Sequence, residues 1–247
     1  MFNFKIGVLS DTHKRGDLQQ EAINHLKEEG AQYLLHLGDF EKPCHLEALA
    51  NSHLPYAAIF GNNDYALRGM DKTFRIKKEP YYLKIKDTTI KMMHLPYYLS
   101  NDTNIVLFGH LHKFSVEFKG GTLFLNSGEI CARNKNLSEC ALIEVSKDKY
   151  IVNYYFREPS TSRWELKEFE FMYWQYIYKI IKWYYQILKL TRDICFDDIL
   201  EKIEKQEIID RKKHPNSSKY PNQMIFIFEI QNYIYYVPYI EDKKKYF

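Results

Sequence analysis

The chain has 247 residues, of which 45% are hydrophobic and 27% are charged, and this balance excludes a mainly disordered protein. Its 35 lysines and arginines nearly match its 32 acidic residues, so the composition does not indicate a binder of nucleic acids or other polyanions. The four cysteines show no CxxC spacing, no apolar run is long enough to span a membrane, and the N-terminus lacks signal-peptide features, so we expect a cytoplasmic protein.

The first part of the chain alternates short apolar runs with helical patterns. Strands are predicted over 5–9, 33–37 and 57–60, with helices over 17–29 and 45–51 between them. Gly30 follows the first of these helices, at the place where glycine commonly ends a helix. This β-α-β-α-β order implies a parallel sheet with right-handed crossovers.

From about residue 74 the pattern changes to one strand after another. The predicted strands cover 80–86, 89–94, 104–108, 114–118, 122–126, 140–146, 150–156 and 164–171. A parallel half followed by a strand-rich half predicts an α/β fold in which two sheets pack as a sandwich.

The composition changes along the chain, because all ten glycines fall within the first 128 residues. We therefore expect one domain over 1–170, an amphipathic aromatic helix or linker over 171–190 and a small α+β segment over 191–247. The aromatic stretch carries its glutamines and lysines on one helical stripe. It could pack on this protein or a partner, lie in a membrane interface, or form an unstructured connector.

The last segment has its own pattern of elements. A helix is expected over 196–208 and a turn-rich stretch over 214–218. Two strands are expected over 224–230 and 233–239, joined at Gln231-Asn232.

Polar residues follow the predicted strands at the points where the strands end. These segments are Asp11-Thr12-His13, Gly38-Asp39, Gly61-Asn62-Asn63-Asp64, His94 and Gly109-His110-Leu111-His112. Ligands of open α/β sheets bind at the carboxyl ends of the strands, so these groups are expected to converge. Their oxygen and nitrogen donors suit manganese, iron or zinc.

Spacing within two of these segments predicts where their side chains point. In an extended chain Asp11 and His13 would face the same way, as would His110 and His112. The glycines beside them would allow tight turns and close backbone approach. The conjunction of the segments, more than any one of them, indicates a metal site.

This series of motifs resembles that of the calcineurin-like metallophosphoesterase superfamily and, within it, the small bacterial YfcE-type phosphodiesterases. The likeness covers residues 1 to about 170, and residues 124–145 are similar to the closing Asn-Pro-Gly segment and final strands of that group. The resemblance implies the two-sheet α/β sandwich of the metallophosphoesterase type. It also implies hydrolysis of a small phosphodiester or phosphate ester.

The resemblance further implies two divalent metal ions, manganese first, with iron, zinc or nickel as alternatives. The implied ligands of one ion are Asp11, His13, Asp39 and His112, and those of the second are Asp39, Asn62, His94 and His110. Asp39 would bridge the ions, and a hydroxide between them would attack phosphorus. The residues expected to act in catalysis are Asp39, Asn62, Asp64 and His110, with Asp64 orienting its neighbours.

Some positions depart from the family pattern. Many relatives carry a histidine after the asparagine of the third motif, where Asn63 cannot protonate a leaving group in that way, and this favours diesters or activated esters. Leu-Pro follows His94 where glycine is common, and Asn126-Ser127-Gly128 replaces Asn-Pro-Gly, so the shape of the substrate pocket stays open. The histidines outside the motifs, which we interpret as structural, are His25, His36, His45 and His53.

Two other functions remain as alternatives. A retromer subunit of the same fold serves as a non-catalytic protein-binding scaffold, and this chain could do the same. From about Leu190 the sequence is also similar to small BrnT-type toxins with a RelE-like ribonuclease fold, although their last strand and basic segment have no counterpart. We expect a truncated fusion without nuclease activity, and association, if any, through the aromatic helix.

Overall fold

The computed structural model describes residues 4–172 and, further along the chain, residues 198, 201–202, 205, 207–213, 215–216, 218, 223–230 and 232–240. The chain forms two compact units, Met1–Ile177 and Tyr178–Phe247, and each is described by itself. The aromatic helix was predicted over 171–190, but residues 171–172 end a strand, and residues 173–190 lie outside the described residues, as does most of the predicted helix over 196–208. Within the described part of the chain, helices that could cross a membrane are absent.

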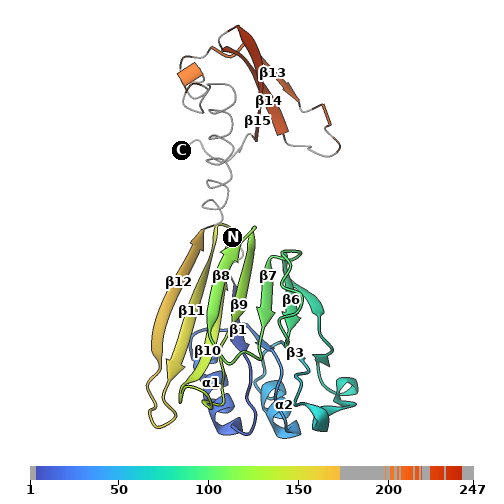
Figure 1. The fold of residues 1–247 in the computed structure, drawn as a ribbon, viewed down its shortest axis with the longest axis vertical. Helices are drawn as coiled ribbons and strands as arrows, with labels where there is room; N and C mark the ends of the chain where they lie inside the picture. Colours follow the sequence, from blue (N-terminus) through green and yellow to red (C-terminus); the bar gives the residue numbers. More distant parts are fainter. Residues whose placement is uncertain are drawn as a thin grey trace. The chain divides into compact units, whose positions relative to one another are not determined.

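The first unit is a sandwich of two sheets (Figure 1), as the sequence predicts. The strands of the larger sheet are β1 (Phe4–Leu9), β2 (Tyr33–His36), β3 (Tyr56–Ile59), β4 (Ile76–Lys77), β10 (Ser138–Val145), β11 (Lys149–Arg157) and β12 (Glu165–Met172). The strands of the smaller sheet are β5 (Tyr81–Ile85), β6 (Thr88–Met93), β7 (Ile105–Phe108), β8 (Ser115–Lys119) and β9 (Thr122–Asn126). Their orders are β12-β11-β10-β1-β2-β3-β4 and β5-β6-β7-β9-β8.

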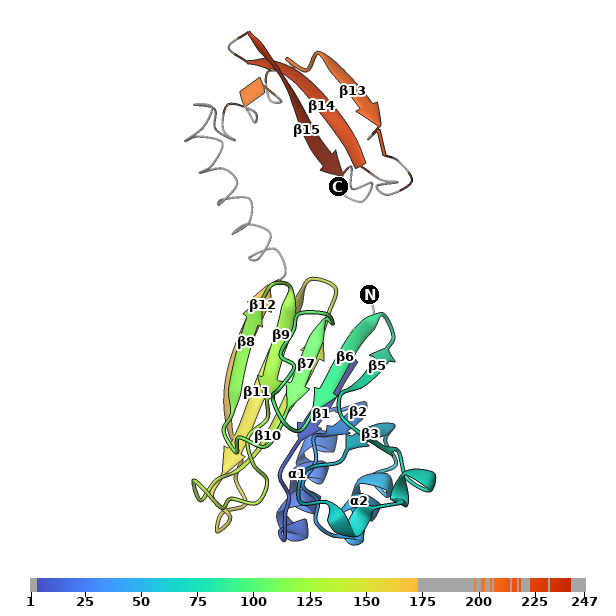
Figure 2. The same cartoon turned by 45° about the vertical axis from the view of Figure 1, so that its right-hand side comes forward.

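Two helices connect the first three parallel strands, as predicted. They are α1 (Gly16–Glu28) and α2 (Pro43–Ala50), and Figure 2 shows both beside β1, β2 and β3. Gly30 has φ +87°, and the N–H of Ala31 donates to the carbonyl of Leu26 at 2.9 Å. This is the glycine-based helix end that the sequence predicts.

Two apolar cores hold the layers together. Between the sheets, buried aliphatic side chains such as Ile6, Leu107 and Ile143 pack with Tyr150. On the other face of the larger sheet, Leu18, Ile23 and Leu26 of α1 and Leu46 of α2 pack in the second core. Burial of this apolar surface fixes both layers and thereby the positions of the loops at the strand ends.

The sequence patterns missed the shortest elements. These are β4 and two single turns of 3₁₀ helix, Tyr65–Leu67 and Met70–Lys72. Such elements contain too few residues for a periodic apolar pattern to form. All of them follow β3 and shape the surface beside the third motif.

The described part of the second unit is an antiparallel sheet. Its strands are β13 (Asp210–Lys213), β14 (Gln223–Ile230) and β15 (Tyr233–Ile240), in that order. The predicted hairpin is confirmed, and Asn232 in its turn has φ +64°. The polar strand β13 was not predicted. Phe228 is fully buried and packs with Phe226, Tyr235 and Val237.

Candidate metal centre

The polar segments singled out in the sequence meet at the carboxyl ends of strands from both sheets. Backbone hydrogen bonds join the loops: the N–H of Asp11 donates to the carbonyl of Gly38 at 3.0 Å, and that of His13 to Asp39 at 2.8 Å. The N–H of Gly109 donates to the carbonyl of His94 at 3.2 Å. The convergence that the sheet topology predicts is therefore present in the structure.

One group of side chains gathers around His112, which follows β7. Its Nε2 lies 3.3 Å from Nε2 of His13 and 3.3 Å from Oδ1 of Asp11. All three side chains are buried. Cys131 lies in the same group, but burial raises the pKa of its thiol to about 12, and the thiol donates to Glu129 at 3.4 Å.

A second group gathers around the side-chain oxygen of Asn62, which follows β3. Asn62 Oδ1 lies 2.9 Å from Nε2 of His94 and 3.0 Å from Nδ1 of His110. His94 is fully buried, and its Nδ1 donates to the carbonyl of Leu37 at 2.7 Å. In the neutral ring, this bond leaves Nε2 as the nitrogen whose lone pair faces the group.

Asp39 lies between the two groups. Its Oδ2 is 3.7 Å from Nε2 of His13 in the first group and 3.5 Å from Nε2 of His94 in the second. Asn63 holds the carboxylate in place, because its N–H donates to Oδ1 at 2.8 Å and its amide to Oδ2 at 2.7 Å. One carboxylate thus connects both groups.

The residues present fit divalent cations. Ligand atoms at about 2.0–2.2 Å from a common ion lie roughly 3–3.5 Å from one another, which is the spacing found in both groups. Asp11 Oδ1 is buried without a hydrogen-bond partner. Two imidazole nitrogens face each other in the first group at 3.3 Å. Two imidazole lone pairs that face each other repel, and a cation between them removes this repulsion.

The backbone at these positions differs from the extended chain that we expected. The residues with positive φ are Asp11 (56°), His13 (48°), Asp39 (60°), His110 (66°) and His112 (52°). Aspartate and histidine tolerate this left-handed region better than most residues, yet each such position costs about 1–2 kcal/mol. The prediction that His110 and His112 face the same way is wrong, because a left-handed turn sends them to different groups.

Two glycines allow the close approach of the motifs. A Cβ on Gly38, which has φ +98°, would lie 2.7 Å from the backbone nitrogen of Gly61. A Cβ on Gly61 would lie 2.1 Å from Oδ1 of Asp39. A side chain at Gly61 would displace the connecting carboxylate, and a side chain at Gly38 would push the backbone of the third motif and the His94 ring away.

Several carboxylates around the two groups were not predicted from the sequence. Glu129 is fully buried and accepts from Nδ1 of His112 and from the N–H of Asn134. Burial raises the pKa of Glu129, but these hydrogen bonds outweigh burial and lower it to about 2. Glu41 Oε1 lies 2.8 Å from Nδ1 of His13. Carboxylates bonded to the outer nitrogen of a ligating histidine orient the ring toward the metal.

Asp64 holds the backbone around the centre in place. Its carboxylate accepts the N–H groups of Asp39 at 2.9 Å, Gly61 at 2.7 Å and Glu41 at 2.8 Å. It therefore ties the second motif to the third. The guanidinium of Arg133, which the sequence did not single out, lies 3.3 Å from Nε2 of His112.

The electrostatics of the centre favour cations. Burial raises the pKa of Asp11 above its ordinary value, so this carboxylate lacks sufficient positive charge nearby. Burial also raises the pKa of Asp39, but hydrogen bonds from His94 and Asn63 outweigh it and hold the pKa well below its usual range. Burial lowers the pKa of His94, whereas the hydrogen bond and charge of Asp39 and the charge of Asp11 raise it to about 9.

Cation binding is consequently expected to release a proton from His94. Below a pKa of about 9 the imidazole is protonated and must lose its Nε2 proton before it can bind a cation. The association constant for Mn²⁺ should therefore rise by up to about tenfold per pH unit from pH 7 toward 9. Calorimetry in buffers of different ionisation enthalpy counts the released protons, and His94→Asn should release one fewer. Affinity that is flat over this range would contradict the assignment.

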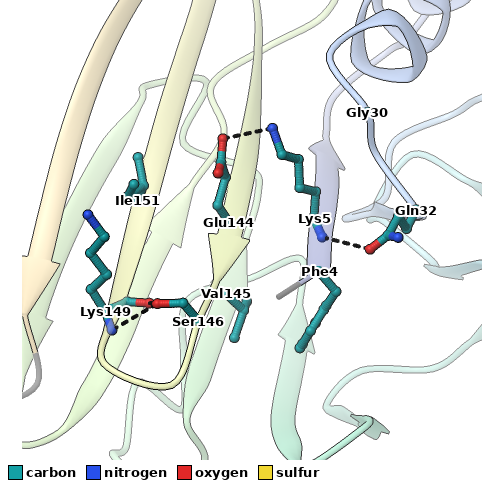
Figure 3. A pocket seen from close by; sticks show the side chains of 9 residues that line it. All are labelled: Phe4, Lys5, Gly30, Gln32, Glu144, Val145, Ser146, Lys149 and Ile151. Carbon is teal, nitrogen blue, oxygen red and sulfur yellow. Dashed lines mark hydrogen bonds and ion pairs between the residues drawn. The ribbon is translucent and has the colours of Figure 1, made fainter. Parts of the chain in front are cut away.

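A separate cavity of about 290 Å³ lies at the other end of the strands (Figure 3). Lys5 at the start of β1 points to Glu144 across it, with Nζ 2.9 Å from the carboxylate, and its N–H donates to Gln32. The candidate ligands follow the opposite ends of the strands. The Lys5–Glu144 pair joins β1 to β10, and we interpret the cavity as structural.

Comparison with protein families agrees with this geometry. The family model for the calcineurin-like phosphoesterase superfamily domain matches residues 4–148, which is more than half of the chain. The chain belongs to this superfamily. Its members depend on metal ions, and the chain brings together candidate ligands for them.

Relatives of this phosphoesterase chain include an enzyme and a sorting protein. A phosphodiesterase of Methanocaldococcus jannaschii is 23% identical over 159 residues, which cover 59% of this chain and 96% of that protein. Vacuolar protein sorting 29 of Cryptosporidium parvum has a TM-score of 0.58 and 19% identity, covering 70% of this chain and all of that one, 100%. The E. coli phosphoesterase YfcE has a TM-score of 0.50 and 19% identity, covering 61% and 91%.

These likenesses show the fold and do not choose between catalysis and scaffolding. The family match ends at residue 148, and none of these relatives supports the toxin-like interpretation of residues 191–247. We therefore assign no function to the second unit. For the first unit, the choice rests on the metal centre itself.

Proposed function

We propose that the first unit is a phosphodiesterase that uses two divalent metal ions. The observation that carries this proposal is the position of Asp39 Oδ2, within 3.7 Å of a ligand nitrogen in each of the two groups. Asp11, His13 and His112 would complete the site of one ion, and Asn62, His94 and His110 that of the other. The mixed oxygen and nitrogen donors suit Mn²⁺ and admit iron, zinc or nickel.

Bound cations would supply an activated water nucleophile and offset the charge of the phosphoryl oxygens. The surrounding residues orient the ligands and bind the phosphoryl group. Glu129 and Glu41 orient the imidazoles of His112 and His13, and Asp64 fixes the loop that carries Asp39. Arg133 brings a guanidinium to the first group, where it can pair with a phosphoryl oxygen.

The leaving group receives no proton from the third motif. Asn63 is committed to Asp39 through both its N–H and its amide, and an amide is not a general acid. This favours leaving groups that depart without protonation, and therefore activated diesters over alkyl monoesters. His110 is exposed at the edge of the centre. Its Nδ1 lies 3.0 Å from Oδ1 of Asn62, and Nε2 of the buried His94 lies 2.9 Å from the same oxygen.

A scaffold without catalysis is the second candidate, because vacuolar protein sorting 29 shares the fold. A scaffold has no need of buried, unpartnered ligand atoms such as Asp11 Oδ1, which are costly without a cation. We therefore favour catalysis over scaffolding. The proposed substrate is a small phosphate ester, and the proposed location is the cell interior.

The experiment is a substrate panel with metals added back after chelation. Bis(p-nitrophenyl) phosphate should be hydrolysed with Mn²⁺ and faster than glycerol phosphate, because p-nitrophenolate departs without protonation whereas an alkoxide does not. p-Nitrophenyl phosphate has the same leaving group and shows whether the centre also accepts a monoester. Iron, zinc and nickel are tested in parallel. Two bound ions per chain are expected by elemental analysis. Absence of turnover with every cation, or a single bound ion, would exclude the dinuclear proposal.

A further inference from the structure

Two grooves open on the candidate metal centre, one at each group of ligands. The first, the Asn62 groove, measures about 690 Å³ and is lined by Asn62, Tyr65, Arg68 and Lys78, among others. The second, the His112 groove, measures about 430 Å³ and is lined by His112, Lys113, Phe114, Lys135 and Tyr154, among others. Each groove thus has a candidate ligand in its lining.

Both grooves contain aromatic rings and cations, but only the Asn62 groove offers an exposed ring. In the Asn62 groove, Tyr65 is 68% exposed and the guanidinium of Arg68 lies 5.3 Å from its ring centre. In the His112 groove, the half-buried ring of Phe114 stacks on Tyr154 with centres 3.8 Å apart, and Phe169 and Phe156 cover their other faces. Lys135 is paired with Glu139 at 2.6 Å, which leaves Lys113 as the exposed cation beside these rings.

Exposed aromatic and apolar side chains concentrate around the same centre. Tyr97 and Tyr98, which are 73% and 64% exposed, lie on the loop that follows His94. Leu111, which is 52% exposed, lies between His110 and His112. Large exposed rings next to cations are the elements with which proteins hold unpaired bases and the phosphates between them.

We propose that the centre acts on short single-stranded oligonucleotides, with one nucleotide in each groove on either side of the scissile phosphate. This rests on the proposed function, since the phosphate that is cut would lie at the metal centre. A phosphodiester has two ester arms: the Asn62 groove gives one arm an exposed ring and a cation, and the His112 groove gives the other arm a cation. A monoester would leave one groove unused.

The overall charge does not oppose this substrate. A net charge of +3 argues against an extended surface for long nucleic acids, whereas a short strand needs only a few local cations. Arg68 and Lys113 provide one on each side of the centre. Bases would stack without sequence preference, because every base has an aromatic face.

Equilibrium binding tests the proposal without catalysis. The full-length protein is titrated in Mn²⁺ with a fluorescein-labelled four-nucleotide thymidylate whose phosphorothioate linkages resist hydrolysis, and fluorescence anisotropy gives Kd at several salt concentrations. Arg68→Ala and Lys113→Ala should each raise Kd about fivefold and each lower the slope of log Kd against log salt by about 0.7. The control is Lys147→Ala, which removes an exposed lysine in the turn between β10 and β11 and should change neither value.

The outcomes separate this inference from the proposed function. Wild-type turnover of bis(p-nitrophenyl) phosphate tests the activity alone. If that diester is hydrolysed but the thymidylate does not bind, the oligonucleotide substrate is refuted and the phosphodiesterase stands. Binding that weakens equally in Lys147→Ala, or in neither groove variant, also refutes the inference. If binding depends on the two grooves but the metal-loaded protein is inactive, the oligonucleotide ligand is supported and the phosphodiesterase activity is refuted.

Discussion

Replacing Asp39 with asparagine is expected to lower kcat for bis(p-nitrophenyl) phosphate by roughly 10³-fold. The substitution keeps the shape of the side chain, and asparagine tolerates the backbone at φ 60°, but the negative charge that lies between the two groups is lost. With Oδ2 at 3.5 Å from His94 and 3.7 Å from His13, both sites should weaken. Initial rates and elemental analysis of the purified variant measure the two effects together.

The matched control for this change is Asp148→Asn, in the exposed turn between β10 and β11. It removes the same charge far along the strands from the candidate ligands and should leave rate and metal content unaltered. An Asp39→Asn protein with both ions bound and full activity would mean that Asp39 does not connect the two sites.

Replacing Glu129 with glutamine is expected to weaken the affinity for the first ion roughly 10- to 100-fold. The buried carboxylate accepts from Nδ1 of His112 and thereby directs Nε2 toward Asp11 and His13. Glutamine still accepts the N–H of Asn134, so the loop should keep its shape. Metal titrations followed by activity measure the change, and saturating Mn²⁺ should restore most of the rate.

Restoration by excess metal distinguishes this positioning role from misfolding, since an unfolded variant would not regain activity. Glu41→Gln is the milder counterpart: Glu41 bonds Nδ1 of His13, but its side chain is 26% exposed, so water can replace it. Its effect on affinity should stay below about tenfold. Equal effects of the two substitutions would contradict the importance assigned to burial.

Much of the first unit could be predicted because its signals are local. The strands before Asp11, Asp39 and Asn62 are short apolar runs that end in turn residues, and the parallel topology brings such ends together. The contact between Glu129 and His112 could not be predicted in this way. It joins residues from different loops, and only the packed sandwich brings a buried carboxylate against that ring.

The expected direction of His110 and His112 failed for a different physical reason. Alternation of side chains applies to an extended strand, but His110 and His112 both adopt left-handed backbone just beyond β7. The strand β7 ends at Phe108, before the motif begins, so the alternation of side chains does not extend to His110 and His112. The ligand types were readable from the residues, and the family resemblance implied their division between two ions, which side-chain alternation alone does not give.

The left-handed backbone beneath the ligands also limits which mutations this chain can accept there. Substitution by a branched residue such as valine would remove the ligand atom and would also strain the left-handed backbone, so one mutation would cause both losses. Asparagine and glycine are the mild replacements, since they tolerate the twist while abolishing or weakening coordination. A homologue that lost metal binding but kept the fold would therefore be expected to carry asparagine or glycine at the ligand positions.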